Sequence, residues 1–258
     1  RAGTDSGYER GQTGGKVTFE LAKMPVYECP SCFRHTLVHK PEDIVVFEPR
    51  YSREAHSHDA WDPTWMTQRF SIALVCSNSS CGEKVVMLGD RKSEEYWDDE
   101  GATYLETYSP KAFYPAPPII DVPPDVPRPI KEAIEKSFEL YWVSSGSCAN
   151  MLRVSVEFIL DFAGIAIDHV NRKGKAERLN LYQRIDLYKA KEPQHGRVFD
   201  ALRLVGNVGS HDGVANDGDI LDAYEIFEAV LAELYAGRTT RLNEMTEKLI
   251  ANKGNSGE

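Results

Sequence analysis

Three polar side chains in the C-terminal half stand four residues apart and have the chemistry to act on a phosphate group. The stretch RLVGNVGSH carries Arg203, Asn207 and His211, and on a continuous helix residues at this spacing share one face. A histidine can move a proton near neutral pH, and an arginine can stabilise charge that develops on a phosphate. With Asn207 orienting the phosphate or ribose, these groups suffice for metal-independent RNA cleavage, in which a 2′-hydroxyl attacks the neighbouring phosphate.

The same stretch also has a purely structural interpretation. Gly206 and Gly209 lie between the three polar residues, and glycine disfavours the interior of a helix and commonly ends one. We therefore expect Arg203 on the last helical turn, Asn207 at or near its end and His211 beyond it. There, Asn207 would cap the helix and His211 would favour its C-terminal dipole.

An arginine and a glutamate interrupt an otherwise apolar helical segment earlier in the chain. Arg153 and Glu157 lie four residues apart in MLRVSVEFIL, and an unpaired charge is costly to bury. One interpretation is an internal ion pair that fixes the helix register. The other is that the pair faces Arg203, Asn207 and His211 in one polar pocket and holds Arg203 in place.

Four of the five cysteines form two close pairs, Cys29 with Cys32 in CPSC and Cys76 with Cys81 in CSNSSC. Two tight turns that each present two thiolates make a tetrahedral metal site. Because four thiolates leave no position for water, we expect one structural Zn²⁺ per chain, which stabilises a small β domain. The 43 residues between the pairs exceed the usual spacing, so two disulfides or unrelated thiols stay open as alternatives.

Three smaller groups of reactive side chains have simpler interpretations. His56 and His58 lie in a polar insertion, where we expect solvent-facing side chains rather than a second metal site. Cys148 opens an apolar helix and is expected in the core. The stretch NRKGKAER fits either a solvated loop between helices or a patch that contacts phosphates. Its basic residues are Arg172, Lys173, Lys175 and Arg178.

The composition is that of a globular protein with an acidic balance. The 258 residues are 41% hydrophobic and carry a formal net charge of −10, which argues against a dedicated DNA-binding module. No apolar run reaches the roughly 18 residues of a membrane span. The first residues lack the hydrophobic core of a secretory signal. We therefore expect no membrane partner and a cytoplasmic location.

A proline-rich segment separates a β-rich part from a helical part, so the predicted fold class is α+β with more than one domain. Short β-branched runs such as QRFSIALVC favour strands before that segment. Half of the chain's 14 prolines lie between Phe113 and Pro129, which excludes a helix interior or a central strand there. We predict a flexible leader at 1–16, a zinc-ribbon-like β domain at 17–112 with an insertion at 39–66, a linker at 113–129, a helical bundle at 130–240 and a charged tail at 241–258.

Five segments in the helical part repeat apolar residues with the period of 3.6 that is typical of helices. They cover residues 129–142, 148–170, 176–190, 196–207 and 219–237. The second is apolar on most sides and is expected to be the central helix. The last begins at an acidic cap, Asp219, and stops at Gly237. Short connections between the segments predict an antiparallel bundle.

The segment from Cys148 to Tyr235 resembles the family known as domain of unknown function 4145. The resemblance rests on LRVSVEFIL in one helix, ALRLVGNVGSH in a later one and a final helix ending LAELY. A cysteine-knuckle module before the helices is common in that family, which looks like a branch of the HEPN superfamily of dimerising all-helical bundles. That superfamily includes RNases of prokaryotic defence systems. The family's hallmark positions fall on Arg153, Glu157, Arg203, Gly206, Asn207 and His211.

Two functional hypotheses follow from the resemblance. The first is an RNA-interacting HEPN-like protein of prokaryotic defence or stress response, with a metal-independent endoribonuclease site at His211, Arg203 and Asn207. In the active relatives the histidine lies closer to the arginine than here, where seven residues separate them. The alternative is a non-enzymatic scaffold or sensor that forms a homodimer through the bundle and recruits a protein or nucleic-acid partner with its zinc domain. No phosphate-binding glycine loop, serine-nucleophile elbow or paired-carboxylate motif supports another enzyme class.

Overall fold

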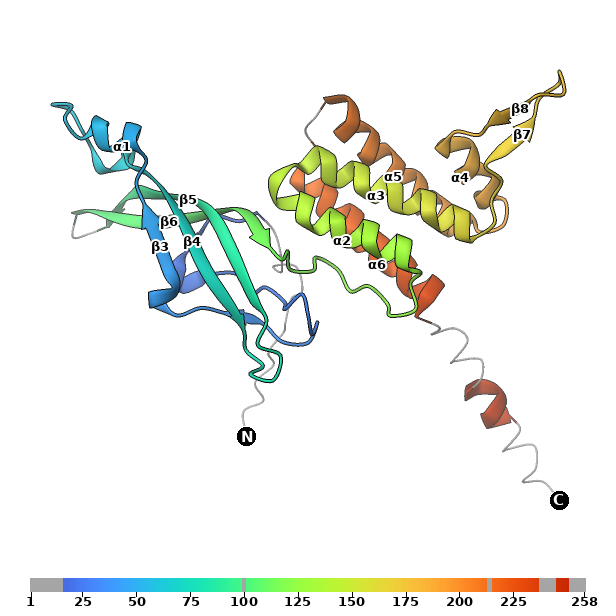
Figure 1. Cartoon of the computed structure of the whole chain (residues 1–258), viewed down its shortest axis with the longest axis horizontal. Helices are drawn as coiled ribbons and strands as arrows, with labels where there is room; N and C mark the ends of the chain where they lie inside the picture. The colour runs from blue at the N-terminus through green and yellow to red at the C-terminus, as the bar shows by residue number, and fades with distance from the viewer. Residues whose placement is uncertain (1–15, 99–100, 213–214, 237–244, 251–258) are drawn as a thin grey trace. The chain divides into compact units, whose positions relative to one another are not determined.

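The chain folds into an antiparallel sheet followed by a set of helices (Figure 1), which confirms the predicted α+β class. The computed structural model describes residues 16–98, 101–212, 215–236 and 245–250, with the backbone alone described for residues 98 and 208–212. Two compact units are present. The first runs to Ile119 and includes Phe138–Ser144, and the second comprises Ile120–Ser137 and the chain from Ser145 onward. None of the described helices combines the length and the apolar character that crossing a bilayer needs.

The first unit is built on one six-stranded sheet in which all neighbours are antiparallel. Its strands are β1 (Phe19–Glu20), β2 (Leu37–Val38), β3 (Ile44–Phe47), β4 (Thr67–Cys76), β5 (Lys84–Asp98) and β6 (Gly101–Tyr114). The order is β1-β6-β5-β4-β2, and β3 also pairs with β4. Short helical turns connect the strands: η2 (Leu21–Lys23), η3 (Pro41–Asp43), α1 (Arg50–Ala55) and η4 (Pro63–Trp65).

Alternating side chains on β4 create the core of this unit. Phe70, Ile72 and Leu74 are buried while the residues between them are more exposed, as expected for a sheet with one covered face. An aromatic cluster continues the core, with ring centroids 4.9 Å apart for Tyr27 and Phe113 and 4.3 Å apart for Phe113 and Trp142. These contacts hold the segment that carries the first cysteine pair against the sheet.

Two parts of the first unit extend beyond the sequence prediction. The segment 39–66, predicted to be a polar insertion, contributes β3 to the sheet. Strand β6 includes Phe113 and Tyr114, which the proline content assigned to the linker. The distal part of the β5–β6 hairpin was not predicted, because residues 102–106 are exposed on both faces and lack the apolar alternation that identifies a strand.

The chain from Arg128 onward consists of helices and one small hairpin, and five helical segments are confirmed there; the last residues of the first of these helices, from Phe138, belong to the first unit. The helices are α2 (Arg128–Val143), α3 (Ser145–Phe162), α4 (Leu181–Lys189), α5 (Pro193–Asp212) and α6 (Asp217–Tyr235), and residues 245–250 are also helical. The hairpin pairs β7 (Asp168–Val170) with β8 (Ala176–Arg178). Apolar side chains from α2, α3, α5 and α6 fill the core, among them Ile134, Leu152, Phe199, Leu202 and Phe227.

The helix predicted at 148–170 was too long, because α3 ends at Phe162. Gly164 has a φ of +68°, and the N–H groups of Gly164 and Ile165 bond to the carbonyls of Asp161 and Leu160. This is the hydrogen-bond pattern of a glycine C-cap. Phe162, the last residue of this apolar helix, is 56% exposed. The residues that follow enter β7, and the predicted helix at 176–190 likewise begins as β8.

The start of α6 also differs from the sequence prediction. Helix α6 is capped by Asn216, whose side chain accepts a hydrogen bond from the N–H of Gly218, rather than by Asp219. The predicted stop at Gly237 lies outside the described residues.

Within the proline-rich segment, Ile120 and Val126 are buried. The N–H of Asp121 donates to the Glu228 carboxylate over 2.8 Å, so this part of the predicted linker packs on the helices.

Candidate functional site

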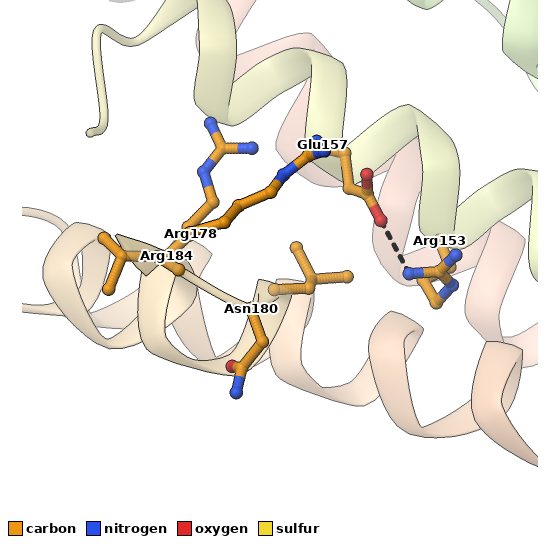
Figure 2. A pocket seen from close by; sticks show the side chains of 7 residues that line it. Arg153, Glu157, Arg178, Asn180 and Arg184 are labelled. Carbon is orange, nitrogen blue, oxygen red and sulfur yellow. Dashed lines mark hydrogen bonds and ion pairs between the residues drawn. The ribbon is translucent and has the colours of Figure 1, made fainter. Parts of the chain in front are cut away.

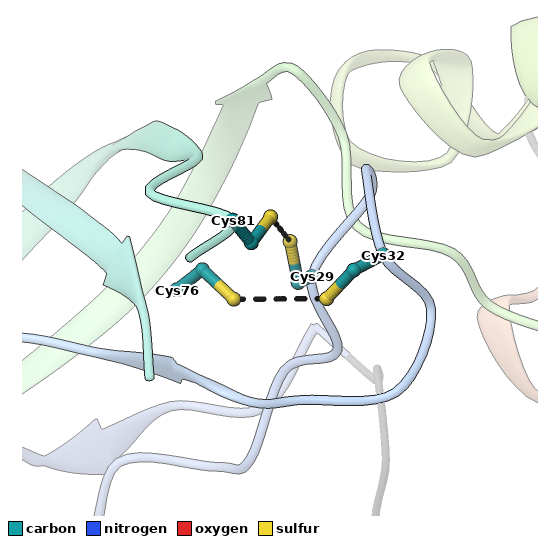
Figure 3. Close-up of side chains that lie close together, drawn as sticks. All are labelled: Cys29, Cys32, Cys76 and Cys81. Carbon is teal, nitrogen blue, oxygen red and sulfur yellow. Dashed lines mark hydrogen bonds between the residues drawn. The ribbon is translucent and has the colours of Figure 1, made fainter. Parts of the chain in front are cut away.

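The four paired cysteines converge on one point of the first unit (Figure 3). Their Sγ atoms all lie within 4.8 Å of one another, with Cys29 3.8 Å from Cys81 and Cys32 3.7 Å from Cys76. Four thiolates placed about 2.3 Å from a tetrahedral ion are about 3.8 Å apart, whereas disulfide sulfurs are about 2.05 Å apart. The geometry therefore fits a four-thiolate metal site and does not fit the disulfide alternative.

The two cysteine turns share a backbone design despite their different spacing. Phe33 and Gly82, each following the second cysteine of its pair, have φ values of 51° and 63°. The N–H of Phe33 bonds to the Cys29 carbonyl and that of Gly82 to the Asn78 carbonyl, both over 3.1 Å. Asn78 thus takes the turn position that Cys29 has in the first pair. Because Cys76 precedes that turn, the longer spacing of CSNSSC still brings its thiol to the site.

The protonation of these thiols depends on their surroundings. Burial raises the pKa of Cys29, and it raises the pKa of Cys76 to about 12, whereas a hydrogen bond from the Arg34 backbone lowers the pKa of Cys32 to about 6. Thiols of raised pKa stay protonated near neutral pH and become thiolates only when a metal cation displaces the proton. The site is therefore suited to a thiophilic divalent ion.

Helix α5 is continuous through Asp212, so the prediction that Gly206 and Gly209 end it is wrong. The backbones of Arg203, Asn207 and His211 lie on this one helix, and the side chain of His211 is outside the described residues. Gly206 has a different role. A Cβ atom there would lie 2.7 Å from the Arg153 Cβ atom and 2.9 Å from the carbonyl oxygen of Ala149. Only glycine allows α5 to approach α3 this closely.

Arg203 is held by residues of α5 and α4. Its guanidinium pairs with Asp200 at 2.9 Å and lies 5.3 Å from the centre of the Tyr182 ring. Burial alone would raise the pKa of Asp200, but hydrogen bonds from Lys189 and Arg203 lower it overall. Neither Arg153 nor Glu157 is a hydrogen-bond partner of Arg203 among the described side chains.

Arg153 and Glu157 form the predicted ion pair, with 2.6 Å between Nη1 and Oε1. They also line a pocket of about 330 Å³ (Figure 2). The opposite wall comes from the end of β8 and the start of α4, not from the Arg203–His211 stripe. Its residues are Arg178, Leu179, Asn180, Leu181 and Arg184.

Arg184 is a pocket residue that the sequence analysis missed. It is 6% exposed and pairs with Asp161 at 2.6 Å. Its position in the sequence could have identified it, because Arg184 lies on the same helical face as the buried residues Ile185 and Tyr188. A charged residue within the apolar face of a short helix indicates a buried ion pair or a binding site.

The remaining candidate residues have local partners. His56 bonds to Glu48 at 2.9 Å, and the Nδ1 atom of His58 accepts a hydrogen bond from the N–H of Ala60. In the described part of the chain, the four cysteines are the one group of metal-ligating side chains that cluster. Cys148 is fully buried, as predicted, with its sulfur 3.3 Å from the Tyr224 hydroxyl.

Two family models match the chain, one for each part. Residues 17–116 match the model of a domain of unknown function (DUF8608), and residues 135–253 match that of a second domain of unknown function (DUF4145). The second match confirms the resemblance inferred from the Arg153 and Arg203 motifs. No curated protein and no solved structure matches the chain.

Proposed function

We propose that the protein interacts with RNA through its second unit and that the β7–β8 hairpin supplies the main phosphate contacts. The observation that carries this proposal is the ordered basic tip of the hairpin. Arg172, Lys173 and Lys175 are exposed there, in a chain whose net charge is −10. A local basic surface on an acidic protein can bind phosphates without attracting nucleic acid to the rest of the molecule.

The side chain of Asn171 and the backbone at Gly174 fix the conformation of the hairpin tip. The Asn171 side chain accepts hydrogen bonds from the N–H groups of Lys173 and Lys175 over 2.9 and 3.1 Å. Gly174 adopts a φ of +72°, which glycine tolerates without strain. A preformed turn loses less conformational entropy when its lysines contact a ligand.

In this proposal the first unit is a zinc-ribbon-like module that holds one Zn²⁺ with Cys29, Cys32, Cys76 and Cys81. The Sγ distances support zinc, because they match its tetrahedral thiolate geometry. The role of the ion is structural, and the sheet around it is the candidate surface for a protein partner. In this proposal the helical unit is HEPN-like and forms a homodimer. The proposed role is in prokaryotic defence or stress response in the cytoplasm.

Neutralising the hairpin lysines is expected to weaken RNA binding. The double variant Lys173→Gln/Lys175→Gln should lower the affinity for a labelled single-stranded RNA by about tenfold at low salt, and it should reduce the salt slope by about 2. Fluorescence anisotropy across a salt series measures both. The matched control is Arg128→Gln/Lys131→Gln, which removes two charges from the exposed side of α2 and should leave binding unchanged. Equal affinity of the wild type and the hairpin variant would contradict the proposal.

RNA cleavage is a second candidate function, and the continuous α5 favours it. An unbroken helix places Arg203, Asn207 and His211 on one face, at i, i+4 and i+8. In this function His211 is the general acid and base, Arg203 stabilises the phosphorane-like charge and Asn207 orients the phosphate or ribose. No metal ion takes part.

His211→Ala is expected to slow RNA cleavage by at least ~100-fold, since general acid–base catalysis contributes that much or more. The assay follows product formation from single-stranded and structured RNA in the presence of a chelator. His58→Ala, which removes an exposed histidine of the first unit, is the control and should cleave normally. Wild-type protein that binds RNA and leaves it intact would exclude the nuclease and favour the non-enzymatic scaffold.

A further inference from the structure

The pocket between α3 and the start of α4 gathers three guanidinium groups (Figure 2). Arg153 and Arg184 each pair with a carboxylate, that of Glu157 and that of Asp161 respectively, both over 2.6 Å. Arg178 is exposed and makes no ion pair with any residue that the structure describes. The pocket therefore keeps one uncompensated positive charge and several unused N–H donors, which favours an anionic occupant over a cation.

Arg184 is the most constrained of these donors. It is 6% exposed, and its Nη2 atom donates to Asp161 and, over 3.3 Å, to the carbonyl of Ile165. Its Nε atom is buried and has no hydrogen-bond partner among the described residues. A buried N–H group is almost always paired in a native protein, so this N–H favours an acceptor that enters the pocket.

The N-terminus of α4 adds a second feature that favours an anion. Asn180 caps the helix in a reciprocal pair of hydrogen bonds with Gln183, and both Asn180 and Leu181 line the pocket. The first N–H groups of a helix have no intrahelical acceptor, and the helix dipole is positive at this end. Helix N-termini combined with arginines commonly bind phosphates.

We propose that this pocket binds the terminal phosphate of a nucleotide-sized ligand. Arg178 and Arg184 donate to the phosphate oxygens, and their planar N–H groups suit phosphate better than a lysine would. The volume of about 330 Å³ lies at the lower end of the ~300–1,000 Å³ range of small-molecule sites, which leaves room for more than a bare ion. Arg172, Lys173 and Lys175 do not line the pocket, so this inference does not depend on RNA binding by the hairpin.

Calorimetric titration of the full chain with adenosine 5′-monophosphate and with adenosine tests the proposal. We expect the nucleotide to bind and adenosine to show no binding. Arg178→Gln should weaken nucleotide binding by at least ~10-fold, because a charge-assisted hydrogen bond to phosphate is lost. Arg197→Gln, which neutralises an exposed arginine of α5 outside the pocket, should leave the affinity unchanged. Equal binding of adenosine, or an Arg178→Gln affinity equal to that of the wild type, would overturn the proposal.

Glu157→Gln is expected to raise the affinity for the nucleotide, the opposite of the effect of Arg178→Gln. Glu157 is the one carboxylate that lines the pocket, so removing its charge should strengthen nucleotide binding by a few-fold to about tenfold. If Arg153 and Glu157 only fix the helix register, this variant would lower the melting temperature without any gain in affinity. That outcome would count against an anion site.

The terminal phosphate has two sources, a free mononucleotide and the 5′ end of an RNA. Competition with 5′-phosphorylated and 5′-hydroxyl RNA of one sequence separates them, using the Lys173→Gln/Lys175→Gln protein so that the hairpin contributes little. Preference for the phosphorylated RNA identifies an RNA end. Equal competition together with nucleotide binding identifies a free nucleotide. If neither the nucleotide nor the phosphorylated RNA binds, the pocket proposal fails, whatever the hairpin variants show with long RNA.

Discussion

Cys29→Ser is expected to abolish metal binding and to unfold the first unit. A structural four-thiolate zinc site contributes an apparent ~10–16 kcal/mol, whereas a whole domain is stable by only ~5–15 kcal/mol. In the proposed zinc site, loss of this binding energy would exceed most of the stability of the unit, so the unit is expected to unfold. Elemental analysis of the wild type should find one zinc per chain. Near-ultraviolet circular dichroism should lose the signal of the cluster formed by Tyr27, Phe113 and Trp142.

Cys148→Ala is the matched control for this prediction. Cys148 is buried in the helical unit and lies outside the metal cluster, so its removal should leave one metal per chain. Acidification should act like the serine variant, because Cys29 and Cys76 have raised pKa values and take protons back as the metal leaves. Wild-type protein that contains no metal when purified without chelator would refute the site.

Replacing Gly206 is expected to destabilise the second unit, by about 2 kcal/mol for alanine and by more for leucine. The added Cβ atom meets the Arg153 side chain and the carbonyl of Ala149 at 2.7 and 2.9 Å, and overpacking of this kind costs about 1–3 kcal/mol. If Gly206 made no close contact, Gly206→Ala would stabilise the unit instead, because alanine is more favourable than glycine in a helix interior by about 1 kcal/mol. Urea unfolding followed by far-ultraviolet circular dichroism decides between the two.

Leu204→Ala controls for the general effect of changing α5. Leu204 is 54% exposed, so its truncation should change the free energy of unfolding very little. A Gly206→Ala protein more stable than the wild type would show that α3 and α5 separate easily at Arg153. Because Arg153 also lines the pocket, the same variant should weaken nucleotide binding if the close helix contact positions its guanidinium.

The α3–α5 contact links the two sequence motifs that contain Arg153 and Gly206. Gly206 touches Arg153, so an arginine in one helix and a glycine in the other form a single packing unit. Arg203 and Asn207 lie four residues apart on α5 and are therefore adjacent on the helix surface. The proposed RNA contacts, the proposed cleavage stripe and the nucleotide pocket use different residues, and the variants described above separate them.

Local sequence patterns were sufficient for the features that depend on neighbouring residues. The helical period predicted α2 to α6, and the spacing of Arg153 and Glu157 predicted their ion pair, since residues four apart on a helix are adjacent. The paired cysteines predicted two metal-binding turns, because each turn is made within a few residues. The α+β class followed from the change of period after the proline-rich segment.

Contacts between distant segments were decided only by the tertiary structure. The sequence does not reveal that Gly206 lies against Arg153, or that Arg178 and Arg184 line a pocket beside α3. The distal part of the β5–β6 hairpin also escaped prediction, because residues 102–106 of β6 are exposed on both faces and lack an apolar alternation. The types of the chemically active residues can thus be read along the chain. Which of them act together depends on packing between helices and strands far apart in sequence, where close approach and burial decide the outcome.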